Sequence, residues 1–108
     1  MDIRFHEKFY TDGLSDKKLA SVKKKIKRKS PKINLFLITL PVGKQGILEI
    51  YWYPELLQSF YQNMDIEMTV VGIARSRETA FELIKTVIKD IGYDKGQIPL
   101  KQFFKECK

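Results

Sequence analysis

Four short segments of the chain carry the alternation, or the continuous run, of apolar residues that predicts β-strands. They cover residues 2–10, 33–40, 47–53 and 66–74. The first alternates loosely, as edge strands do, whereas the second is almost continuously apolar and suits a central position. Two longer segments, 15–29 and 77–91, repeat their apolar residues at the spacing of an amphipathic helix instead.

The two predicted helices differ in how much apolar surface they carry. The helix over 15–29 has Ser15 as an N-cap and only a narrow apolar seam, formed by Leu19, Val22 and Ile26. The helix over 77–91 follows Ser76, a second capping residue, and has a wider stripe. Gly92 is well placed to stop it.

The order of elements is therefore β-α-β-β-β-α, with a less regular stretch at 54–63 and a short C-terminal extension. That stretch fits either one or two turns of helix or a compact loop. Short connections favour antiparallel neighbours among the three later strands. We expect residues 1–108 to form a single α+β domain. Its architecture would be a two-layer sandwich, with a mainly antiparallel sheet of about four strands and both amphipathic helices on one face.

Targeting and disulfide signals are missing from the sequence. The N-terminal residues do not resemble a secretory signal, and the most apolar stretch, 33–42, is about half the length a bilayer requires. Cys107 is the only cysteine, so no disulfide framework can form. We therefore expect a soluble, cytoplasmic protein that is not transmembrane.

The positive charge of the chain is concentrated in the first predicted helix. Within sixteen residues and without an intervening acid, it carries Lys17, Lys18, Lys23, Lys24, Lys25, Lys27, Arg28, Lys29 and Lys32. The rest of the chain holds eleven basic and thirteen acidic residues. The net charge of +7 thus describes one face of the protein and not its whole surface.

Several readings of this basic face remain open. It can neutralise nucleic-acid phosphates, lie on anionic lipid, meet an acidic protein, or simply be a solvated helix face. Lysine predominates over arginine, which favours non-specific contact over the reading of bases. If six phosphates were neutralised, log affinity would fall against log salt with a slope of about −5.

Catalytic and cofactor motifs are lacking. His6 is the only histidine, which excludes a multi-histidine metal site. Residues 43–46 contain glycine and lysine without the spacing of a phosphate-binding loop, and we interpret them as a hairpin turn. We expect no cofactor, no metal and no catalytic residue, and favour a non-catalytic binding or regulatory module.

An aromatic group provides the alternative, a small-molecule sensor or enzyme. We expect Trp52 to be buried, because it shares a strand face with Leu48 and Ile50. Tyr51, Tyr53 and Tyr61 are the candidate ligand or interface residues, with Tyr51 and Tyr53 on a sheet face left uncovered by the helices. Such a face, or a free strand edge, would also permit a homodimer.

A family resemblance covers roughly residues 47–104. It lies in the segments 47–50, 56–57, 60–61, 70–74, 82–84 and 103–104, together with Ala80 and Ile88. Over these positions the chain resembles an uncharacterised group of small bacterial proteins, and the resemblance implies no activity or site. In element order alone, residues 15–91 are also similar to a double-stranded-RNA-binding domain, with Arg75 and Arg77 at the start of the last helix. Glu78, and the position of the lysines on the first helix, depart from that pattern.

Overall fold

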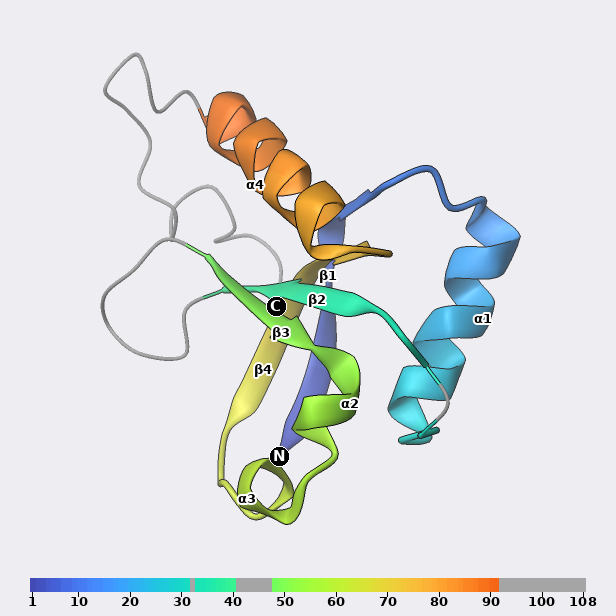
Figure 1. Cartoon of the computed structure of the whole chain (residues 1–108), viewed down its shortest axis with the longest axis vertical. Coiled ribbons are helices and arrows are strands. Elements are labelled where there is room, and N and C mark those ends of the chain that lie inside the picture. Colours follow the sequence, from blue (N-terminus) through green and yellow to red (C-terminus); the bar gives the residue numbers. More distant parts are fainter. Residues whose placement is uncertain (32, 41–47, 92–108) are drawn as a thin grey trace.

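The computed structural model describes residues 1–31, 33–40 and 48–91. Its elements follow the predicted order (Figure 1): β1 (Asp2–Thr11), α1 (Asp16–Lys27), β2 (Phe36–Thr39), β3 (Glu49–Trp52), α2 (Tyr53–Leu56), α3 (Ser59–Gln62), β4 (Glu67–Ala74) and α4 (Arg77–Ile91). The α+β class and the four strands are confirmed. The irregular stretch consists of two single-turn helices. The turn expected at 43–46, the stop at Gly92 and the C-terminal extension lie outside the described residues.

The four strands form one mixed sheet in the order β1-β4-β2-β3. β2 pairs antiparallel with both β3 and β4, as expected for the three later strands. β1 lies at an edge, as predicted, but it pairs parallel to β4. β4 is the central strand of longest pairing, and Val70, Val71 and Ile73 on it are fully buried.

The pairing of β4 with β2 contains a register shift. Ile38 lies opposite Gly72, whereas the next residue, Thr39, lies opposite Val70, so Val71 is the extra residue of a bulge. Gly72 fits here because of a close approach: a Cβ at this position would lie 3.1 Å from the Tyr10 carbonyl oxygen.

The two long helices lie on opposite faces of the sheet, so the expectation that they share one face is wrong (Figure 1). Ile26 of α1 belongs to the apolar cluster that contains Leu37 of β2, and Val87 of α4 belongs to the cluster that contains Ile38. Consecutive strand residues point to opposite faces. Since Leu37 and Ile38 are both fully buried, each face requires its own cover.

Trp52 is also placed differently from the prediction. It lies at the end of the edge strand β3, opposite Phe36, and its side chain is 43% exposed. Its indole N–H donates a hydrogen bond to Asn34 Oδ1 at 2.8 Å. Trp52 belongs to neither apolar cluster, so the prediction that it is buried is wrong.

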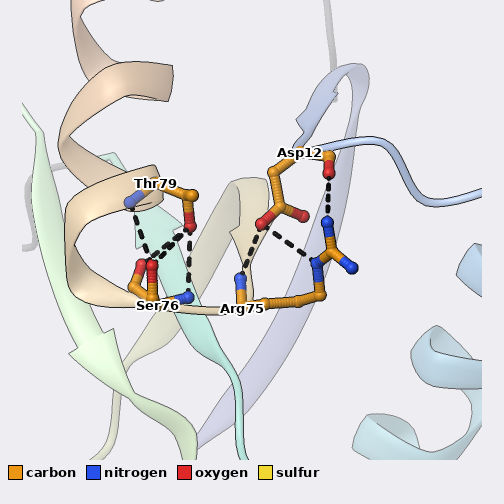
Figure 2. A network of polar contacts seen from close by, with 4 residues as sticks. All are labelled: Asp12, Arg75, Ser76 and Thr79. Atoms are coloured by element: carbon orange, nitrogen blue, oxygen red, sulfur yellow. Dashed lines mark hydrogen bonds and ion pairs between the residues drawn. The ribbon is translucent and has the colours of Figure 1, made fainter.

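A polar network joins the end of β1 to the start of α4 (Figure 2). The Asp12 carboxylate accepts the Arg75 backbone N–H at 3.0 Å and the Arg75 Nε–H at 3.3 Å. The Ser76 hydroxyl accepts the Thr79 N–H, while the Thr79 hydroxyl accepts the Ser76 N–H. Ser76 is thus the predicted cap, in a reciprocal arrangement that pairs two N–H groups of the helix start.

Candidate functional site

Helix α1, which carries the basic residues, has well-defined ends. The Ser15 hydroxyl accepts the Lys18 N–H at 3.2 Å, which confirms the predicted N-cap. At the other end the Lys29 N–H bonds to the Ile26 carbonyl and the Ser30 N–H to the Lys25 carbonyl, both at 3.0 Å. These two bonds form a Schellman motif, which requires a left-handed residue after the cap. Lys29 takes that conformation, with φ at 58°.

The narrow apolar seam of α1 is turned towards the sheet. Ile26 is 1% exposed, and Leu19 and Val22 are half-buried against the same apolar cluster. The expected packing of this seam is therefore confirmed. Because the apolar seam packs against the protein interior, α1 does not offer an apolar stripe to a binding partner.

Two lysines at the edge of the seam attach α1 to β1. The Lys23 ammonium lies 4.3 Å from the centre of the Phe9 ring and 5.4 Å from that of Phe5. The Lys27 ammonium lies over the Phe5 ring as well and donates a hydrogen bond to the Ile3 carbonyl. These cation–π and hydrogen-bond contacts give both lysines a packing role.

Five further cations of α1 are exposed. At 100° per residue, Lys17, Lys24 and Arg28 lie opposite the apolar seam, whereas Lys18 and Lys25 lie about 80–100° round the helix from them. We call these five residues the outer basic face. Lys32, also predicted to belong to it, lies outside the described residues.

No carboxylate among residues 1–31, 33–40 and 48–91 forms an ion pair with the outer basic face. Within the described part of the chain, ion pairs are formed by Arg4 with Glu67, Arg75 with Asp12 and Lys85 with Glu82. None of these pairs involves α1. The positive potential of the helix is therefore available to an external anion.

The two arginines at the start of α4 make contacts within the protein. The Arg75 guanidinium donates to the Asp12 carbonyl oxygen at 3.0 Å in addition to its bond with the carboxylate. The Arg77 guanidinium lies 5.3 Å from the centre of the Phe36 ring. The arginine pair suggested by the similarity to double-stranded-RNA-binding domains is thus part of the fold's own packing.

The three candidate tyrosines do not share one surface. Tyr51 and Tyr61 form an edge-to-face pair with ring centres 6.2 Å apart, whereas Tyr53 is fully buried at the start of α2. Burial, and a 2.9 Å bond from the Tyr51 hydroxyl to Glu49, raise the pKa of Tyr51 to about 12. The uncovered sheet face expected to carry Tyr51 and Tyr53 does not exist, because α1 and α2 pack on that side.

The sole histidine is a buried part of β1. His6 is 3% exposed, and its Nδ1 accepts the Lys8 backbone N–H at 2.9 Å. It lies within the irregular stretch of β1 between Phe5 and Tyr10. Across the described segments, no three His, Cys, Asp or Glu side chains gather as metal ligands would.

A cavity that the sequence did not indicate lies beside the C-terminal end of α1. It measures about 330 Å³, and its lining includes Lys29, Tyr53 and Gln62. These residues are far apart along the chain, and only the packing of α1 and α2 over one face of the sheet brings them together. No local sequence pattern could have indicated this site.

The search for membrane-spanning helices and the comparisons with known proteins give no indication of the function. In the described part of the chain, no helix combines the length and the apolar character needed to cross a bilayer. The resemblance to uncharacterised small bacterial proteins stays a prediction. No family model, curated protein or solved structure matches this chain.

Proposed function

We propose that the protein is a non-catalytic binding module of the cytoplasm that associates with nucleic acid through the outer basic face of α1. The observation that supports this most directly is the set of five exposed cations that form no ion pair with a carboxylate of the described residues. Such a face gains free energy by displacing the counterions condensed on a phosphate backbone.

The dimensions of the face suit a row of phosphates. From Lys17 to Arg28 the helix rises about 16 Å at 1.5 Å per residue. Phosphates of one DNA strand follow each other at about 3.4 Å along the axis, so this length spans about five of them. Four of the five cations are lysines, which contact phosphates as point charges and do not favour bidentate base recognition.

Anionic lipid suits this helix less well than nucleic acid does. A helix that lies on a membrane buries an apolar face in the acyl boundary, but the apolar seam of α1 is packed inside the protein. The large apolar side chains exposed in the described segments are Trp52, Phe60 and Phe81, and none of them is on α1. An acidic protein partner remains as an outcome of the test.

The test is the salt dependence of affinity for a labelled duplex, measured by fluorescence anisotropy. Five neutralised phosphates predict a slope of log affinity against log salt of about −4.5. The variant Lys17→Gln/Lys24→Gln should bind with a slope of about −2.7, because two contacts are lost. Glutamine has a helix propensity close to that of lysine, so α1 should remain intact.

A matched control separates position from net charge. Lys85→Gln/Lys89→Gln removes the same two charges from α4, on the opposite side of the sheet, and should leave the slope unchanged. Equal slopes for the two double variants would contradict the proposal. So would binding to vesicles of anionic lipid, or to polyglutamate, without binding to the duplex.

A further inference from the structure

The cavity beside α1 has the form of a small-molecule site. It lies where the start of β1, the end of α1 and the helices α2 and α3 meet. Ile3, Ile26 and Leu56 provide apolar walls, and Gln62 of α3 and Glu67 of β4 are among the polar residues of the lining. Its volume of about 330 Å³ is at the lower end of the range for ligand pockets.

Two polar atoms of the lining residues are buried without a hydrogen-bond partner in the described part of the chain. They are the Tyr53 hydroxyl and Gln62 Oε1. The Gln62 amide cannot simply be turned over, because its Nε2 donates to the Leu56 carbonyl at 2.6 Å. One donor and one acceptor are therefore left over, and buried polar groups of this kind are normally paired.

Lys29 adds a positive charge to the lining of the same cavity, and its backbone has a conformation that is unfavourable for a lysine. Its φ of 58° is left-handed, where glycine is the usual residue. Of the other lining cations, Lys27 is bound to the Ile3 carbonyl, Arg4 is paired with Glu67 at 3.8 Å, and the Met1 ammonium donates to the Gln62 carbonyl at 3.1 Å. Lys29 has no such partner among the described residues. The Lys29 ammonium is therefore the lining cation that remains free to meet a ligand.

From these groups we infer that the cavity binds a small organic anion that carries a hydroxyl group. The Lys29 ammonium and the Tyr53 hydroxyl contact the anionic group, and Gln62 Oε1 accepts the ligand hydroxyl. Four lining cations, Arg4, Lys27, Lys29 and the Met1 ammonium, face two lining carboxylates, Asp2 and Glu67, which leaves two net positive charges. The site is distinct from the outer basic face, since none of its five residues lines the cavity.

Four probes distinguish the chemistry of the ligand in calorimetric titrations of the full chain. Glycerol 3-phosphate and glycerate both combine an anion with hydroxyl groups, whereas inorganic phosphate and glycerol each lack one of the two. We expect one of the hydroxylated anions to bind saturably and at least about tenfold more tightly than phosphate or glycerol. Tighter binding of glycerol 3-phosphate would identify the natural ligand as a phosphate ester, and tighter binding of glycerate would identify it as a carboxylate.

Two variants test the assigned groups. Lys29→Gln removes the charge and keeps the left-handed backbone, and Tyr53→Phe removes only the hydroxyl; each should weaken the bound probe about tenfold. Tyr51→Phe is the control, because Tyr51 does not line the cavity, and it should bind as the parent does. Tyr53→Phe should also unfold no earlier than the parent, since its hydroxyl has no protein partner to lose.

The inference is overturned if no probe binds saturably at millimolar concentration, or if both variants bind as the parent does. An earlier unfolding of Tyr53→Phe would overturn it as well, because the hydroxyl would then be paired within the protein. None of these results bears on the slope measured for the outer basic face, so the two proposals fail separately.

Discussion

Replacing Lys29 by glycine should stabilise the protein. The left-handed conformation costs a residue with a Cβ about 1–2 kcal/mol, and glycine avoids this cost. Glycine also makes the unfolded chain more flexible, which returns about 0.5–1 kcal/mol. The net gain in the free energy of unfolding is about 0.5–1 kcal/mol. For a domain of this size it corresponds to an increase in Tm of about 2–4 °C.

Thermal unfolding followed by circular dichroism measures this gain, and Lys29→Ala is its control. Alanine removes the same charge but keeps the Cβ and hence the strained backbone, so its stability should stay within about 0.5 kcal/mol of the parent. The comparison isolates conformation from charge. If Lys29→Gly is no more stable than Lys29→Ala, α1 does not end in the Schellman motif described above.

Three further changes test the packing of the sheet and the helix start. Asp12→Ala should lower the free energy of unfolding by about 1–3 kcal/mol in urea, because the backbone N–H and the Nε–H of Arg75 lose their carboxylate acceptor. A loss below 0.5 kcal/mol would contradict that pairing. Gly72→Ala should cost about 1–3 kcal/mol, since its Cβ would lie 3.1 Å from the Tyr10 carbonyl oxygen, and an unchanged urea midpoint would contradict it. The pKa values of Tyr10 and Tyr51 are raised to about 12, from 10.0 in the unfolded chain. The folded protein therefore holds protons that the unfolded chain releases, and stability should fall as pH rises from about 10 to 12. Replacing both tyrosines by phenylalanine should flatten this part of a Tm-against-pH curve, and an equally steep fall in the variant would show that other groups cause it.

Local patterns in the sequence were sufficient to predict the two long helices, α1 and α4. Ser15 and Ser76 cap α1 and α4 because a hydroxyl next to free N–H groups needs only its neighbours in the chain. The apolar seam of α1 packs as its spacing predicts. Such features depend on residues that are close together in the chain, so they can be predicted before the fold is known.

Placement of the helices depended on information of longer range. A sheet with one covered face would have needed polar residues on the other, yet Leu37 and Ile38 in β2 are both buried. The continuous apolar run was correctly assigned to a central strand, but it also implies cover on both faces. A strand that is buried on both sides requires one helix on each face of the sheet, not two helices on the same face.

The aromatic residues show where strand alternation stops being informative. Tyr53 was placed on a sheet face together with Tyr51, but β3 ends at Trp52 and Tyr53 begins α2. Pro54 lies in the first turn of that helix and marks the change. Once the chain leaves the strand, odd and even positions no longer correspond to faces, and Tyr53 turns inward towards the cavity.

The central claim is that the outer basic face of α1 contacts nucleic acid, and mapping of backbone amide chemical shifts tests it most directly. On addition of a short duplex at low salt, we expect the largest changes between Lys17 and Arg28. The amides of α4, on the opposite side of the sheet, should be nearly unaffected. Changes centred on α4, or on the exposed Trp52 corner, would contradict the claim.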